Sequence, residues 1–193
     1  MSLLTVLYAA LFYAATALLV VGLARKMIDY ARTPAPLKIP TTPAPTTSSG
    51  VALRLTREVV FFESLFKSSK WTWLFGWMFH AALLLVLLRH LRYFQEPVWT
   101  PVLWVQFAGT YAGFGMVAGL AGLWARRFLV DRVRYISTPS DHLHLALLLA
   151  IGASGLTMRF VAHTDIVALK AFMLGLMRFD WQPLPGDPLL LLH

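Results

Sequence analysis

The sequence predicts an all-α integral membrane protein, a single domain over residues 1–193 built as a bundle of five transmembrane helices. Of its residues, 58% are hydrophobic and only 13% are charged, and the mean hydropathy is +0.65. A soluble domain of this size is rarely so apolar. Several apolar runs also approach the roughly 20 residues that a helix needs to cross a bilayer.

The first apolar run, Leu3–Leu23, predicts a retained transmembrane helix. Its positive charges follow it rather than precede it, and it has no evident cleavage site, so we expect the N-terminus to lie outside. Residues 33–50 are rich in Pro, Ser and Thr and predict a cytoplasmic linker. Residues 51–70 mix apolar and charged side chains, which predicts one amphipathic helix at the cytoplasmic interface.

Three further spans and the start of a fifth follow. Their predicted ranges are 71–93, 102–124, 142–160 and an apolar segment from Leu189 that stops at His193, inside what we expect to be a longer helix. Residues 162–187 form the predicted outer connection, with a short amphipathic helix around 167–179. The third span carries Gly109 with Gly113 and Gly115 with Gly119, and such spacing favours close helix packing.

The distribution of positive charge supports this topology. The chain has a net charge of +8 and 17 Lys and Arg residues. Twelve of them fall in segments assigned to the inside and five in segments assigned to the outside, as the positive-inside rule requires. Because the basic residues lie beside apolar runs, we interpret them as topology signals and expect no nucleic-acid partner.

Two histidines, His80 and His90, lie in the second predicted span. Ten helical residues separate them by about 15 Å along the axis and about 80° around it, so both can face one bundle interior at two depths. Ionisable side chains within a span usually mark function, and neutral imidazole is a common haem ligand. The absence of cysteine excludes covalent haem and an iron–sulfur cluster held by this chain. The pair therefore predicts two stacked b-type haems, although hydrogen bonding to neighbouring helices would explain a single histidine.

The second ligand of each haem has several candidates. By depth, His144 suits His80 and His163 suits His90. The second and fourth spans run parallel, however, and 19 helical residues cover about 28 Å rather than about 15 Å, so both pairs cannot form at once. His193 opens an antiparallel span at the outer level and suits His90 better. We therefore expect the partner of His80 to lie beyond residue 193.

Several stretches resemble the gamma subunit of respiratory nitrate reductase, a five-helix di-haem cytochrome b. They are the ten-residue histidine spacing, RRFLVDRVRYISTPSD and PGDPLLLLH. Within that superfamily, ESLFKSSKWTWLFGWMFH and LRHLRYF are most similar to DsrM, the group of membrane cytochromes b in dissimilatory sulfur metabolism. The resemblance implies that His90 and His193 ligate an outer haem b and that His80 ligates an inner one. The family's second inner ligand has no counterpart in this sequence.

The resemblance also implies a function, namely electron transfer between the quinone pool and a cytoplasmic, DsrK-like iron–sulfur subunit of a DsrMKJOP-type complex in the cell's inner membrane. Other membrane and outer-face subunits are expected partners. Arg89 and Arg92 adjoin His90 and suit haem propionates, or they are arginines that extend to the membrane boundary. Tyr93, Arg92 and Lys170 are the predicted quinone contacts because they can donate hydrogen bonds at the outer face.

A redox-silent membrane anchor or a small transport subunit is the alternative. It requires the same helices but neither His80 nor His90. No acidic residue lies in a predicted span, which disfavours proton-coupled transport.

Overall fold

The computed structural model describes residues 2–34, 45 and 47–193, and within them it is all helical, without a strand. Four of the helices in this part of the chain are long and apolar enough to cross a membrane: α1 (Leu3–Arg32), α4 (Lys70–His90) with its 3₁₀ extension η1 (Leu91–Phe94), α6 (Gln106–Leu129), and α8 (Pro139–Thr157) with the π-helical turn η2 (Met158–Ala162). The prediction of an all-α membrane protein is therefore confirmed. The fifth span, represented by the short helix α10 (Pro188–Leu192), and the outside N-terminus stay predictions.

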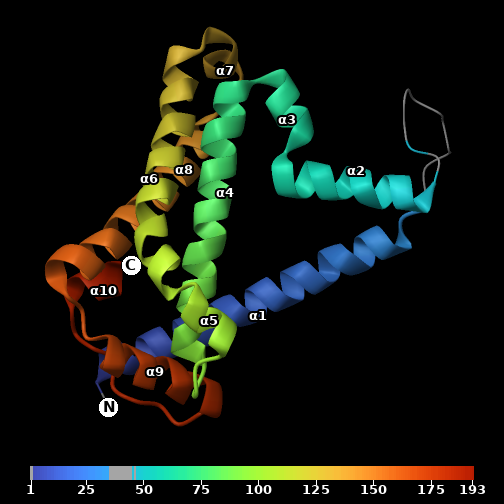
Figure 1. Ribbon diagram of the computed structural model, residues 1–193. Helices are drawn as coiled ribbons and strands as arrows, with labels where there is room; N and C mark the ends of the chain where they lie inside the picture. Colours follow the sequence, from blue (N-terminus) through green and yellow to red (C-terminus); the bar gives the residue numbers. More distant parts are fainter. Residues whose placement is uncertain (1, 35–44, 46) are drawn as a thin grey trace.

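Helices α4, α6 and α8 form the packed centre of the bundle (Figure 1). Glycines of α6 allow the close approach of α4, since a Cβ on Gly119 would lie only 2.9 Å from the Phe75 carbonyl oxygen. Gly109 faces α4 in the same way, whereas Gly113 faces Leu156 of α8. The glycines thus serve helix packing as predicted. The pair Gly115 and Gly119 faces α4 alone, whereas the pair Gly109 and Gly113 is divided between α4 and α8. The apolar core between the helices consists of Phe79, Ala82, Met116 and Leu120.

The predicted amphipathic helix over residues 51–70 is wrong as a single element. It is two helices, α2 (Ser48–Phe61) and α3 (Glu63–Ser68), which meet at Phe62 with φ 51°. The indoles of Trp73 and Trp77 donate hydrogen bonds to the carbonyls of Phe61 (2.7 Å) and Val60 (2.9 Å). These bonds satisfy carbonyls that the end of α2 leaves free and hold that end of α2 against α4. The linker at 33–50 lies largely outside the described residues.

The third and fourth spans differ from their predicted boundaries. The third is interrupted at Val105, which separates α5 (Thr100–Trp104) from α6. The Gln106 side chain donates to the Val102 carbonyl at 3.0 Å and so bridges this break. Helix α8 begins three residues before the predicted start, because Thr138 and Asp141 form a capping box at its N-terminus.

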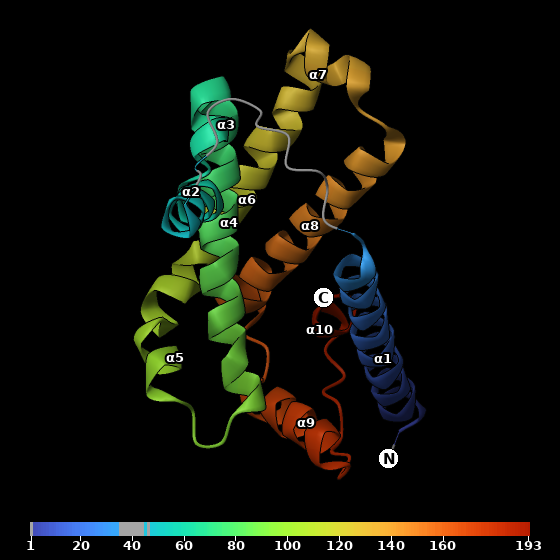
Figure 2. The same ribbon diagram turned by 90° about the vertical axis from the view of Figure 1, so that its right-hand side faces the viewer.

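The chain after α8 returns across the first half of α1. Helix α9 (Ile166–Arg178) matches the predicted amphipathic helix within one residue at each end. Phe172 and Leu176 of α9 are buried with Ala9 of α1, and the Tyr8 hydroxyl donates to the Leu191 carbonyl at 2.7 Å. These contacts hold α10 between α1 and α8, as Figure 2 shows, while the remainder of α1 leans away from the bundle.

Candidate functional site: a histidine-lined cavity

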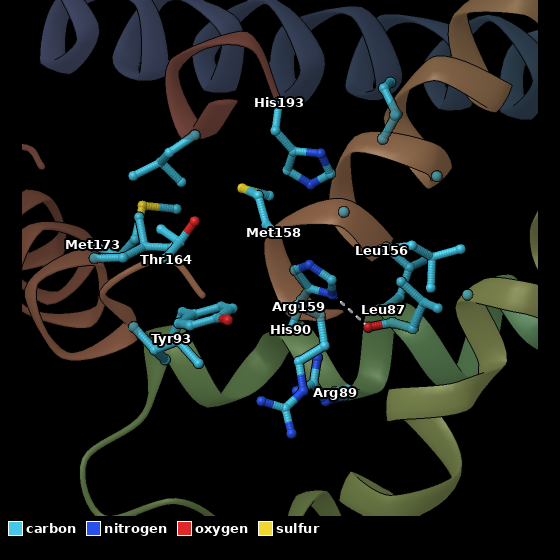
Figure 3. Close-up of a pocket in the computed structure, with 18 of the residues that line it drawn as sticks. Leu87, Arg89, His90, Tyr93, Leu156, Met158, Arg159, Thr164, Met173 and His193 are labelled. Carbon is cyan, nitrogen blue, oxygen red and sulfur yellow. Dashed lines mark hydrogen bonds between the residues drawn. The ribbon is translucent and has the colours of Figure 1, made fainter. Parts of the chain in front are cut away.

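A cavity of about 610 Å³ lies between α1, α4, α6, α8, α9 and α10, within the size range of sites for cofactors and other small molecules. Most of its wall is apolar, with side chains such as Leu156 and Met158. His90 from α4 and His193 at the end of α10 both point into it, from opposite sides (Figure 3). The structure therefore brings together the two residues predicted to share the outer haem.

The hydrogen bond of His90 fixes which ring nitrogen is free. Its Nδ1 lies 2.7 Å from the Val86 carbonyl oxygen, one turn earlier in α4 (Figure 3). A carbonyl only accepts, so Nδ1 carries the proton and neutral His90 keeps the lone pair on Nε2. This is the tautomer that a metal ligand requires.

His193 reaches the cavity because the start of α10 is fixed in place. Asp187 caps this helix by accepting from the Leu189 amide at 3.0 Å, and it also accepts from the Thr164 hydroxyl at 2.7 Å. The Thr164 hydrogen bond, followed by the Leu189 amide, holds the pKa of the Asp187 carboxyl below its usual range. An ionised Asp187 is the stronger helix cap.

A second hollow of about 450 Å³ adjoins the cavity and is lined by the arginines Arg89, Arg92 and Arg159. Arg89 and Arg159 line both spaces. Arg92 donates to the Gln106 side chain at 3.2 Å, whereas Nε of Arg89 is buried without a hydrogen-bond partner in the described part of the chain. A buried donor of this kind costs about 1–3 kcal/mol unless an acceptor is supplied. The hollow is therefore suited to carboxylates.

The two spaces together fit a haem. The apolar cavity suits the macrocycle, the imidazoles of His90 and His193 suit the iron, and the arginines suit the propionates. Among the described residues no group of three or more His, Cys, Asp or Glu side chains could hold a bare metal ion. The two imidazoles of His90 and His193 would nevertheless be sufficient to hold the iron of a haem.

His80 lies three residues, less than one helical turn, before Leu83, the first α4 residue that lines the cavity, and does not line it itself. Its Nδ1 is 2.7 Å from the Gly76 carbonyl oxygen, so it too keeps a lone pair on Nε2. The rings of Phe62 and Phe79 pack edge-on against the imidazole at centroid distances of 5.1 and 4.8 Å. The structure thus separates His80 from the His90 site, and its role as a ligand stays a prediction.

The three residues predicted to contact a quinone do not line one common space. Tyr93 lines the histidine cavity and Arg92 lines the arginine hollow, and the Arg92 guanidinium lies 5.8 Å from the centre of the Tyr93 ring. Lys170 lines neither space and instead forms an ion pair with Glu96. That ion pair ties α9 to the loop after η1.

The remaining histidines, His142, His144 and His163, lie in three different environments. His163 lines the cavity and ends the π turn with φ 52°. His144 is exposed, and its Nδ1 is 2.6 Å from the Ser140 carbonyl oxygen. His142 differs because its Nδ1 accepts from the Trp124 indole at 2.9 Å, which leaves the proton of the neutral ring on Nε2.

Sequence reasoning did not identify Arg159 or Ser154 as site residues. Arg159 joins Arg89 at the hollow although 70 positions separate them, and Ser154 lies 2.8 Å from the imidazole of His193. A charged residue so close to the end of an apolar span was a usable signal for Arg159. A serine in a helix gave no comparable signal.

Residues 63–182 match the family model described as the nitrate reductase gamma subunit. The chain belongs to the nitrate reductase gamma-subunit family. No solved structure gives a significant match.

Two relatives carry the name Hdr-like menaquinol oxidoreductase cytochrome b-like subunit. The one from Archaeoglobus fulgidus is 36% identical over 87% of this chain, and the one from Archaeoglobus profundus is 32% identical over 97% of it. The alignments cover 63% and 68% of these relatives. The family match includes α4, α6, α8 and α9, and therefore every element of the site except α1 and α10.

Proposed function

We propose that this chain is a membrane cytochrome b subunit that transfers electrons in a menaquinol-linked respiratory complex, with His90 and His193 as axial ligands of one haem b. The observation that carries the proposal is the meeting of two imidazoles across an apolar cavity that adjoins three arginines. Family membership and the names of the two relatives support it.

Each group at the site has a defined task. A bound haem supplies one-electron transfer. His90 and His193 hold the iron through Nε2, and the surrounding apolar side chains exclude water. Arg89, Arg92 and Arg159 bind the propionates, which gives the buried Nε of Arg89 the acceptor that it lacks within the described chain.

A second haem b on the inner side is the natural role for His80. Its free Nε2 is available as one ligand, and Phe62 and Phe79 restrict the orientation of the ring. Two haems at the depths of His80 and His90 would connect the two faces of the membrane.

The quinol site adjoins the outer haem. Tyr93 and Arg92 lie together in η1, directly after α4, and donate hydrogen bonds to quinone oxygens. Lys170 is the third member of this site, and there its ion pair with Glu96 has to open. Oxidation of a quinol releases two electrons and two protons, and the protons leave toward the outer face.

The opposite end of the bundle is the proposed docking face for a cytoplasmic, DsrK-like iron–sulfur subunit. Helix α7 (Asp131–Ile136) and the end of α6 supply Arg126, Arg127, Arg132 and Arg134 there. Helix α3 lies near the same end, and α2 extends sideways from it (Figure 1). A basic surface favours association with an acidic partner. We place this complex in the inner membrane, in sulfur metabolism of the DsrMKJOP type.

A reduced-minus-oxidised spectrum of purified membranes, with a pyridine haemochrome count, tests the proposal. We expect b-type absorbance that menaquinol analogues reduce, and two haems per polypeptide. A purified protein without a Soret band would overturn the proposal and favour the redox-silent anchor or transport subunit.

A further inference from the structure

His193 is held differently from the other two proposed iron ligands. Nδ1 of His80 and Nδ1 of His90 bond to main-chain carbonyls of their own helix, at Gly76 and Val86. Nδ1 of His193 instead lies 2.8 Å from the hydroxyl oxygen of Ser154, 39 residues earlier and on α8. The orientation of this one imidazole therefore depends on a side chain that can be replaced.

The hydrogen-bond directions at Ser154 follow from its second partner. Its hydroxyl oxygen is also 3.0 Å from the Ile151 carbonyl oxygen, to which the hydroxyl donates. Since a hydroxyl has a single proton, its oxygen must accept from His193. His193 Nδ1 therefore donates to the Ser154 hydroxyl oxygen, and that hydroxyl donates to the Ile151 carbonyl. The lone pair of the His193 ring stays on Nε2.

Gly155, the residue after Ser154, leaves room for the His193 imidazole beside the backbone of α8. A Cβ added to Gly155 would lie 3.1 Å from Cε1 of His193, which is tighter than an ordinary van der Waals contact. Ser154 and Gly155 thus act together, because one binds the imidazole and the other lets it lie close to α8. Met158, one turn further along, borders the same cavity.

We propose that Ser154 is a positioning residue for His193, which fixes the tautomer and orientation of this ligand and strengthens its donation to iron. The proposal rests on the proposed function, which makes His193 a ligand. Outer partners of metal-bound histidines orient the ring and raise its basicity. A more basic imidazole stabilises the oxidised iron, so Ser154 should keep the reduction potential of the outer haem low.

Two substitutions at Ser154 test this role. Ser154→Ala removes the acceptor, and we expect a higher reduction potential of the outer haem, an altered low-temperature EPR signal of its oxidised form, and roughly 10–100-fold weaker haem retention. Ser154→Thr keeps the hydroxyl and should preserve all three properties. The control is Thr157→Ala on the same helix, whose hydroxyl donates to the Ala153 carbonyl at 2.9 Å; it should leave them unchanged.

The outcomes separate this proposal from the function on which it rests. If Ser154→Ala leaves the potential and the EPR signal unchanged while His193→Ala removes the outer haem, His193 is a ligand but Ser154 does not position it. If Ser154→Ala and Ser154→Thr disturb the haem equally, the hydroxyl is not responsible and the positioning role is wrong. If His193→Ala leaves the haem count intact, the ligand assignment itself fails.

Discussion

Gly109 of α6 lies directly against Arg89 of α4: a Cβ on the glycine would stand 2.8 Å from Cβ of the arginine and 2.9 Å from the Leu85 carbonyl oxygen. A distance below 3 Å to the backbone cannot be relieved by a side-chain rotation. The contact therefore sets the separation of α4 and α6 beside His90.

Replacement of Gly109 by Ala should force these helices apart and lower stability by about 1–3 kcal/mol, the usual cost of overpacking. Thermal unfolding of the detergent-purified protein measures the change. Gly22→Ala on α1 is the matched control, since nothing lies within 4 Å of the added Cβ. Equal melting temperatures for the two variants would contradict the packing role of Gly109.

The ligand assignment predicts different outcomes for different histidines. His90→Ala should abolish the outer haem and menaquinol-dependent reduction, and His80→Ala should spare the outer haem but stop electron delivery to the cytoplasmic partner. His142→Gln should leave the haem count unchanged, because Nδ1 of His142 already accepts from Trp124. The pyridine haemochrome count measures how many haems each variant binds. A normal count in His90→Ala would contradict the ligand assignment. His163→Gln should also keep both haems, although His163 lines the cavity.

The arginine hollow predicts a charge effect on the outer haem. Arg159→Met should weaken haem retention about tenfold or more, as expected for loss of a charge-assisted hydrogen bond. It should also lower the reduction potential, because a nearby cation favours the reduced iron. Redox titration measures the potential, with Arg178→Met at the exposed end of α9 as the control. A raised or unchanged potential would argue against binding of propionates in this hollow.

The predicted orientation can be tested without background labelling because the chain has no cysteine. Ser49→Cys, exposed on α2, should react with a membrane-impermeant thiol reagent only from the cytoplasmic side. Asp180→Cys, exposed after α9, should react only from the outside. The reverse pattern would invert the bundle and with it the depths of the two haem sites.

The proposed docking face predicts salt-dependent electron transfer. Arg132→Glu on the exposed α7 should slow electron delivery to the iron–sulfur subunit severalfold at low ionic strength and less at high salt, because screening weakens surface attraction. The kinetics of haem reoxidation measure this rate. Arg178→Glu, at the opposite end of the bundle, should have no effect, and equal slowing in both variants would count against a specific docking face.

The sequence by itself determined the membrane class, the approximate ranges of the four long apolar helices, and His90 and His193 as candidate partners. These follow from hydropathy, charge and residue spacing along single helices, which are local properties. The break at Phe62 was not predictable in this way, because the bonds from Trp73 and Trp77 that fix it come from the next helix.

Only the tertiary structure decided which distant side chains share the cavity. Arg159 meets Arg89, and Ser154 meets His193, because α8 packs beside α6 and because α1 holds α10 in place. Lys170 was assigned from its position near the outer face, but the fold pairs its charge with Glu96, 74 residues away. Hydrogen bonds and ion pairs act over about 3–4 Å, so the packing of whole helices, rather than spacing within one helix, determines these partners.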